Sequence, residues 1–189
     1  MRRICVYCGS NRGARPEYAG AAVRLGEELV RRGLELVYGG SSKGIMGVLA
    51  DAVLDRGGTA IGVMPHSLVR KEIAHGGLQE LHVTETMHER KAMMAGLSDG
   101  FVALPGGFGT LEEIVEVITW GQLGFHTKPC GLLNVAGYYD RFLNYVAHAV
   151  DEGFLRDGHR RMLLVAAEPA ELLDGFASYA APKLEKWVD

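Results

Sequence analysis

The strongest constraint on the fold is an alternation of short apolar runs and helical patterns along the whole chain. Seven runs rich in aliphatic, β-branched or aromatic residues are typical of buried strands, at residues 3–8, 34–38, 59–64, 81–85, 101–104, 130–135 and 162–166. Helical spacing of apolar residues follows at 16–32, 45–55, 87–97, 111–123, 139–152 and 169–179. This order predicts an α/β fold, a doubly wound, mainly parallel, Rossmann-like sheet of about seven strands with helices on both faces.

The same pattern leaves one long interruption and no boundary between domains. Residues 65–80 are rich in loop signals, and loops of that length in a compact domain tend to be functional. No linker, low-complexity segment or repeat divides the chain, and 189 residues with 48% apolar content suit one sizeable core. We therefore expect residues 1–189 to form a single domain.

Charge and hydropathy argue against two classes of partner. The formal net charge is −3 and there is no long Lys/Arg run, whereas a nucleic-acid surface is normally strongly basic. The first residues lead directly into a strand pattern without a signal-peptide core, and no window approaches the roughly 18 apolar residues of a membrane span. We expect a cytoplasmic protein that binds small ligands, with neither nucleic acid nor a membrane as partner.

Two glycine-rich turns follow predicted strands and precede predicted helices. Residues 105–113 are Pro-Gly-Gly-Phe-Gly-Thr-Leu-Glu-Glu, and residues 39–44 are Gly-Gly-Ser-Ser-Lys-Gly. Such turns direct bare N–H groups and the positive helix end toward one spot, which favours a phosphate. Neither turn matches a dinucleotide fingerprint or a Walker loop. For the second turn, the alternative is that Ser41 or Ser42 only caps the next helix.

One arginine and three acids stand out near the first turn. Arg90 lies on an apolar helical stripe with Met87, Met94 and Leu97, so it needs either a structural ion pair or an anionic ligand. Thr110 and Glu113 have the spacing of a capping box, in which the carboxylate only satisfies a backbone N–H. The crowding of acids at one helix start instead favours a carboxylate held for chemistry, and this crowding involves Glu112, Glu113 and Glu116.

The cysteines do not predict a metal site. Cys5 and Cys8 are three residues apart in a strand, so their side chains point to opposite faces and cannot easily clamp one ion. Cys130 adds no second pair, and His88 lacks the second histidine of a zinc helix. We expect core thiols, no disulfide and no metal.

The segment Met-His-Glu-Arg-Lys at 87–91, followed by residues 105–113, resembles the paired signature of the Lonely Guy (LOG) family of cytokinin riboside 5′-monophosphate phosphoribohydrolases. Segments 7–11, 38–47, 119–124 and 131–139 are similar to family blocks in the same order, so the resemblance covers nearly the whole chain. Residues 39–41 are Gly-Gly-Ser where many relatives have three glycines. Family members have often been labelled lysine decarboxylases, but no lysine here stands out as a pyridoxal-phosphate ligand.

The resemblance implies a cofactor-free hydrolase of cytokinin biosynthesis. It implies cleavage of the N-glycosidic bond of N6-modified adenosine 5′-monophosphates, and of AMP, to free base and ribose 5-phosphate, by one nucleotide-monophosphate-binding domain that forms a homodimer. Arg90 and Glu113 match the catalytic positions. A carboxylate there can stabilise oxocarbenium character on the ribose and orient or deprotonate water. The implied substrate-binding residues are Ser10, Gly39, Gly40, Ser41, Gly44, Met46, Gly47, Glu72, Lys91, Gly106, Gly107, Phe108, Gly109, Thr110, Leu111, Glu112 and Thr119.

Two further expectations concern the base and the oligomer. Glu72 falls in the long loop, where its carboxylate could accept a hydrogen bond from the exocyclic amine of adenine. Residues 114–123 are apolar nearly all round, which suggests a helix buried on both sides, as at a subunit interface. The alternative function is a non-catalytic carrier of a nucleotide or of the molybdenum cofactor.

Overall fold

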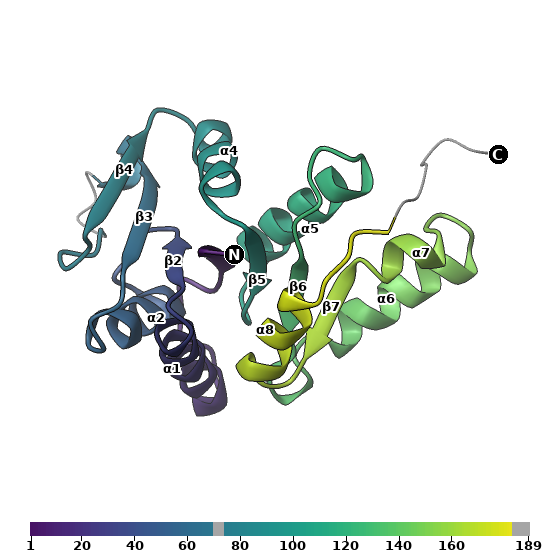
Figure 1. The fold of residues 1–189 in the computed structure, drawn as a ribbon, viewed down its shortest axis with the longest axis horizontal. Coiled ribbons are helices and arrows are strands. Elements are labelled where there is room, and N and C mark those ends of the chain that lie inside the picture. Colours follow the sequence, from purple (N-terminus) through teal and green to yellow (C-terminus); the bar gives the residue numbers. More distant parts are fainter. Residues whose placement is uncertain (70–73, 183–189) are drawn as a thin grey trace.

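A computed structural model describes residues 1–69 and 74–182 and contains one seven-stranded sheet (Figure 1). The strands are β1 Arg3–Tyr7, β2 Glu35–Tyr38, β3 Ala60–Pro65, β4 Glu80–Thr84, β5 Gly100–Ala103, β6 Cys130–Leu133 and β7 Leu163–Ala166. Their order is β4-β3-β2-β1-β5-β6-β7, and every adjacent pair is parallel. The predicted fold class is confirmed.

Helices cover both faces of the sheet. The helices on one face are α1 Pro16–Arg31, α2 Gly44–Leu54 and α8 Pro169–Ala177, and those on the other are α4 Met87–Leu97, α5 Phe108–Gln122 and α6 Asp140–Asp151. In Figure 1, α1, α2 and α8 lie below the sheet, and α4 and α5 lie above it. The shorter helical turns are α3 His66–Val69, α7 Asp157–Arg160 and the 3₁₀ turn η1 Val135–Gly137. Within the described residues, no helix is both long and apolar enough to cross a bilayer.

The two faces have separate hydrophobic clusters, and the cysteines divide between them as predicted. Cys8 packs in the cluster under α1 and α2, whereas Cys5 and Cys130 pack in the cluster under α4 and α5. All three thiols are free and buried. Alternation along β1 therefore separates Cys5 from Cys8.

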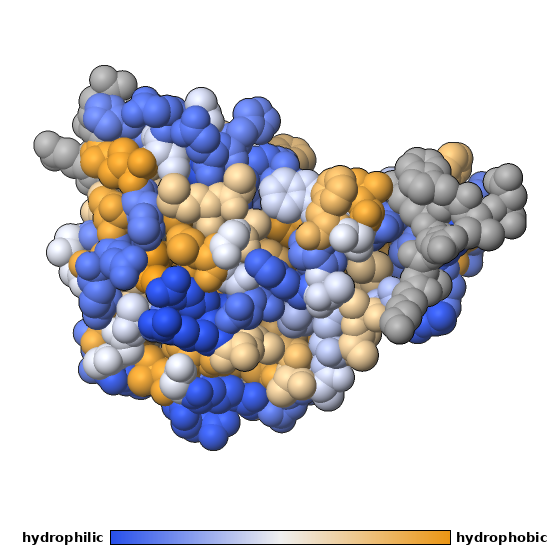
Figure 2. Space-filling view, turned by 45° about the horizontal axis from the view of Figure 1, so that its top comes forward, coloured by the Kyte–Doolittle hydropathy of each residue, from blue (hydrophilic) through white to orange (hydrophobic). Residues whose placement is uncertain are grey.

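Within one copy of the chain, helix α5 is buried on one side. Its fully buried residues are Thr110, Ile114 and Val117, whereas the Val115 side of the helix reaches the surface. Hydrophobic residues also reach the surface elsewhere, and Figure 2 shows them in separate patches among hydrophilic ones. A helix that is apolar all round but covered on one side only leaves an apolar face for another contact.

The carboxyl ends of the central strands bring the glycine-rich turns together. The chain runs from β1 outward to β4, returns to β5 beside β1, and then runs outward to β7, so β1 and β5 flank the topological switch point. The Gly9 N–H donates to the Pro105 carbonyl at 3.1 Å, and the Ile45 N–H donates to the Gly9 carbonyl at 3.0 Å. The turns after β1, β2 and β5 thus form one platform at this edge.

Candidate active site

The turn after β5 is shaped by a close approach that only glycine permits. A Cβ on Gly106 would lie 2.7 Å from the Thr110 Cβ and 2.9 Å from the Gly9 nitrogen. Helix α5 then starts at Phe108, with Gly107 in an extended conformation as its N-cap. The first N–H groups of a helix have no intrahelical acceptor. Within the described chain, the N–H groups of Gly106 and Gly107 and the Thr110 hydroxyl also bond to no protein group.

This helix start corrects one interpretation of the sequence. Thr110 is the third residue of α5 and not its N-cap, so Thr110 and Glu113 do not form a capping box. The capping box belongs to α4: the Glu89 N–H donates to the Thr86 hydroxyl at 3.1 Å, and Thr86 N–H donates back to the Glu89 carboxylate at 3.4 Å. The Glu113 side chain is therefore free for another contact.

That contact is an ion pair with Arg90 across the α4–α5 interface. Arg90 Nη1 donates to Glu113 Oε1, and Arg90 Nε donates to the Val63 carbonyl within β3 at 3.0 Å. The side chains are 8% and 12% exposed, respectively, so little water screens the pair. Glu113 Oε2 accepts no hydrogen bond from the described residues and remains available to a ligand or water.

Burial controls the acidity of Glu113. Loss of hydration raises the pKa of this carboxyl above its usual value, and the neighbouring Arg90 charge offsets only part of that rise. Glu113 is thus a stronger base than an exposed glutamate while staying in hydrogen-bond contact with a fixed cation. A raised pKa combined with a specific charge partner is a physical indication of a functional carboxylate.

Lys91 forms a second set of ion pairs beside the first. Its ammonium contacts Glu112 and lies 3.0 Å from Glu116 Oε1. The Glu112 carboxylate raises the pKa of Lys91. The crowding of Glu112 and Glu116, which the sequence suggested was a sign of chemistry, therefore has a structural explanation, and Glu113 alone of the three acids faces Arg90.

The turn after β2 lies directly against Arg90. A Cβ on Gly39 would lie 2.6 Å from Arg90 Nη2 and 3.0 Å from Met46 Sδ. The Ser41 hydroxyl accepts from the Lys43 N–H at 3.1 Å, and Lys43 is the N-cap of α2 without a side-chain cap. Neither serine is the N-cap of α2, so the alternative of a serine cap is wrong.

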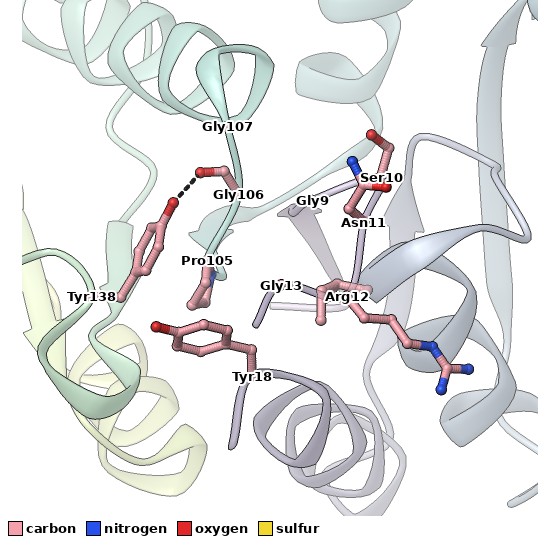
Figure 3. Close-up of a pocket in the computed structure, with 11 residues that line it drawn as sticks. Gly9, Ser10, Asn11, Arg12, Gly13, Tyr18, Pro105, Gly106, Gly107 and Tyr138 are labelled. Atoms are coloured by element: carbon pink, nitrogen blue, oxygen red, sulfur yellow. Dashed lines mark hydrogen bonds between the residues drawn. The ribbon is translucent and has the colours of Figure 1, made fainter. Parts of the chain in front are cut away.

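A cavity of about 270 Å³ opens at the switch point between β1 and β5 (Figure 3). It is lined by residues 9–13, 45 and 105–107 together with Tyr18 from α1 and Tyr138 from the turn after β6. Arg90 and Glu113 are not among its lining residues: Arg90 lies against Gly39 and the Val63 carbonyl, and Glu113 lies against Arg90. Of the expected site residues it contains Ser10, Gly106 and Gly107. The sequence interpretation missed both tyrosines: Tyr18 comes from α1 after β1, and the adjacency of β6 to β5 brings Tyr138 to this edge.

The remaining expected site residues lie on the turn after β2, at the start of α2, on α5 or outside the described residues. Gly40, Gly44 and Gly47 belong to the turn after β2 and the start of α2, and Gly109 and Leu111 belong to the first turn of α5. Phe108 is 93% exposed at the tip of the α5 turn, and Thr119 lies farther along α5, where its hydroxyl donates to the Val115 carbonyl at 2.8 Å. Glu72 lies outside the described residues.

The arrangement combines an anion cradle with a carboxylate on one helix. The free N–H groups begin at Gly106, and Glu113 follows six residues after Gly107, which is about 9 Å along a helix at 1.5 Å per residue. A ligand with a phosphate on the N–H groups can therefore place an electron-poor carbon beside Glu113. No group of three or more His, Cys, Asp or Glu residues in the described chain could hold a metal ion.

Known proteins match this chain at the level of both sequence and fold. Residues 46–176 match the protein family described as "Possible lysine decarboxylase". The chain is 54% identical over 173 residues to the cytokinin riboside 5′-monophosphate phosphoribohydrolase LOG of Oryza sativa subsp. japonica, covering 92% of this chain and 72% of that protein. It is 48% identical over 188 residues to a cytokinin riboside 5′-monophosphate phosphoribohydrolase of Arabidopsis thaliana, covering 100% and 88%.

Solved structures of lower sequence identity share the fold. The molybdenum cofactor binding protein of Rippkaea orientalis is 21% identical with a TM-score of 0.71, covering 94% of this chain and 97% of that one. The molybdenum cofactor carrier protein of Chlamydomonas reinhardtii is 22% identical with a TM-score of 0.69, covering 93% and 95%. At this identity, the likeness concerns the architecture alone.

Proposed function

The chain belongs to the Lonely Guy family of cytokinin riboside 5′-monophosphate phosphoribohydrolases, and from this membership we propose that it is an N-glycosyl hydrolase. Its substrates are N6-modified adenosine 5′-monophosphates and AMP, and its products are the free base and ribose 5-phosphate. Residues 1–189 act as one nucleotide-monophosphate-binding unit. The observation that supports this most directly is the placement of an anion cradle and the Glu113 carboxylate along α5, with Arg90 of α4 paired to Glu113.

The substrate binds with its phosphate on the start of α5. The free N–H groups at Gly106 and Gly107, those of the first helical turn, and the Thr110 hydroxyl donate to phosphate oxygens. The turn around Gly39 and Gly40 then contacts the ribose, and the exposed Phe108 lies at the rim of the site. These roles rest on the free donors and on the close packing of the three turns.

Hydrolysis breaks the bond between the ribose C1′ and the base nitrogen. That bonding pair leaves with the base, C1′ gains oxocarbenium character, and the Glu113 carboxylate stabilises the developing charge. Glu113 Oε2 accepts a proton from water as the water oxygen bonds to C1′, and that proton finally resides on the released base. Arg90 holds Glu113 Oε1, so the free oxygen faces the sugar.

None of the lysines that the structure describes supports the decarboxylase description. A Schiff-base lysine needs a lowered pKa so that its amine is neutral, as a hydrophobic pocket or a second cation provides. Lys91 is the buried lysine among the described residues, and its two carboxylate partners raise its pKa instead. Lys91 therefore stays an ammonium that joins α4 to α5.

The test is product formation by the purified chain with AMP and with isopentenyladenosine 5′-monophosphate. Chromatography should show base and ribose 5-phosphate appearing in equal amounts, and the ratio of kcat/KM for the two nucleotides gives the preference for the N6 substituent. Tight binding of a nucleotide without release of ribose 5-phosphate would instead favour the carrier function. Absorbance from pyridoxal phosphate in the purified protein would support the decarboxylase.

We also propose that the chain is a homodimer joined through α5. Val115, Ile118 and Thr119 of α5 line an apolar groove of about 200 Å³ with Phe142 and Tyr145 of α6. A groove of this character on one side of an apolar helix suits an isologous contact with the same groove of a second copy. This contact would bring Thr119 close to the partner copy, so that Thr119 could contact a ligand bound in the partner's site. Light scattering after size exclusion should give twice the monomer mass.

The three unpaired cysteines are the basis for proposing a cytoplasmic location. Free buried thiols suit a reducing compartment, where disulfides are rare. Fluorescence microscopy of a tagged chain in its own cells tests this.

A further inference from the structure

The turn that would hold the substrate phosphate has its carbonyl groups tied back by neighbouring elements. Each of three consecutive carbonyl oxygens accepts one hydrogen bond: Leu104 from the Tyr139 hydroxyl at 2.7 Å, Pro105 from the Gly9 N–H at 3.1 Å, and Gly106 from the Tyr138 hydroxyl at 2.5 Å. Figure 3 shows the last of these bonds, with the Tyr138 ring approaching the turn from the side of β6.

These bonds fix the directions of the N–H groups that face the ligand. In a trans peptide, the carbonyl of one residue and the N–H of the next point in opposite directions, and the described residues contain no cis bond. The Tyr138 hydroxyl on the Gly106 carbonyl therefore sets the direction of the Gly107 N–H. The bond from Gly9 sets that of the Gly106 N–H in the same way. The bond to Leu104 orients no N–H group, because proline follows.

We propose that Tyr138 is a positioning residue for the substrate phosphate. Its hydroxyl holds the Gly106–Gly107 peptide with the N–H toward the anion, so the cradle is formed before the substrate arrives. This role rests on the proposed function, in which the turn binds a 5′-phosphate. Core packing does not explain a tyrosine at position 138, because Tyr138 is 40% exposed whereas the adjacent Tyr139 is 1% exposed.

The turn that carries Tyr138 is built to hold it in place. Ala136 has a φ of +50°, a left-handed conformation that residues with a Cβ rarely adopt. Asn134 braces this turn: its Oδ1 accepts from the Tyr139 N–H at 2.7 Å, and its Nδ2 donates to Asp140 Oδ1 at 2.8 Å. The Tyr138 ring also packs edge-on against Tyr18 with centroids 5.5 Å apart. The Tyr138 hydroxyl is therefore held in position to donate to the Gly106 carbonyl.

Tyr138→Phe tests this role, since it removes only the hydroxyl and keeps the ring against Tyr18. We expect the Kd for ribose 5-phosphate and the KM for AMP to rise by the same factor, about three- to tenfold, with kcat changed by less than about twofold. Affinity for adenine, which has no phosphate, should not change. Tyr139→Phe is the matched control, because it removes a buried hydroxyl that bonds two carbonyls earlier, at Leu104, and it should lower Tm without changing either constant.

Calorimetric titration with ribose 5-phosphate separates the two proposals. It measures the binding step whether or not the chain hydrolyses AMP, so absence of hydrolysis refutes the proposed function and leaves the role of Tyr138 still measured. Three results would overturn that role: equal Kd values for Tyr138→Phe and the wild type, equal losses of affinity in both tyrosine variants, or no binding of ribose 5-phosphate by the wild type.

Discussion

Replacing Glu113 with glutamine should separate catalysis from stability, because burial acts on the two in opposite directions. Burial raises the pKa of Glu113, so the folded protein holds the charged carboxylate less favourably than the unfolded chain does. Protonated Glu113 favours the folded state, and this contribution to the free energy of unfolding is complete at pH values below the pKa of the unfolded chain. It is lost as pH rises through the pKa of Glu113 in the folded protein. A neutral glutamine has no charge to bury, so it avoids that loss.

Arg90 keeps hydrogen-bond partners in the Glu113→Gln protein. The glutamine oxygen can still accept from Nη1, and Nε keeps the Val63 carbonyl. Removing one partner of a buried ion pair usually costs stability, but here desolvation of the carboxylate outweighs the attraction to Arg90. We expect Tm at pH 7 to equal or exceed that of the wild type, and the two Tm values to converge below pH 4.5. A Tm lower by more than about 4 °C, roughly 1–2 kcal/mol for a chain of this size, would refute the dominance of burial.

Activity should change in the opposite sense. A unit charge about 4 Å from the oxocarbenium centre contributes about 4 kcal/mol at an effective dielectric constant of 20, and proton transfer contributes about 10²- to 10⁴-fold. We expect kcat for AMP to fall by about 10³-fold or more with KM changed by less than about threefold. Glu116→Gln is the matched control on the same helix, because Glu116 contacts Lys91 and not Arg90. A Glu113→Gln kcat within about tenfold of the wild type would exclude the carboxylate from the chemistry.

Three further predictions concern Gly39, the pH dependence of activity and the buried cysteines. Gly39→Ala places a Cβ 2.6 Å from Arg90 Nη2 and should displace the guanidinium, so kcat/KM should fall by about 100-fold. Tm should stay nearly constant, because the end of the Arg90 side chain can move aside. Unchanged kinetics would mean that the position of Arg90 is not critical. In the kcat profile, activity should be lost on acidification as the proposed base Glu113, whose pKa burial raises above 4.5, becomes protonated. The kcat profile is preferable to that of kcat/KM, because free substrate phosphate titrates near pH 6. Native protein should react slowly with a thiol reagent and rapidly after denaturation, because burial raises the pKa of Cys5 to about 12, and fast native reaction would contradict the burial of Cys5, Cys8 and Cys130.

The order of elements could be predicted because it depends on local patterns. Each strand is a short apolar run ended by a turn, and each main helix has an apolar stripe, so neighbouring residues carry the information. The start of α5 was placed three residues too late because Gly107 takes an extended conformation, and a glycine allows many backbone conformations that its neighbours do not specify. The Thr110–Glu113 spacing then suggested a capping box at a point where the helix had already begun.

The sequence singled out Arg90 and Glu113 of the candidate site but could not show how they pair. Arg90 stood out because a guanidinium on an apolar stripe needs an anion, and Glu113 because acids were crowded at a helix start. Which anion Arg90 takes depends on how α4 packs against α5, and that packing joins residues 23 apart in sequence. Tyr138 was harder to find, because its contact with Gly106 depends on β6 lying next to β5, which the strand order determines.

The two sets of ion pairs between α4 and α5 together fix how α5 is rotated about its own axis. Glu112 and Glu116 are four residues apart and share one side of the helix, whereas Glu113 lies about 100° from Glu112 around the helix axis. A compact ammonium can serve both Glu112 and Glu116, as Lys91 does. The planar fork of Arg90 instead reaches Glu113 and the Val63 carbonyl in two fixed directions. With both sets in place, α5 cannot rotate without breaking one of them, so its N–H groups and the free oxygen of Glu113 are held in one fixed relation to each other. Arg90→Lys would therefore lose the bond to Val63 or the bond to Glu113, even though the charge is kept.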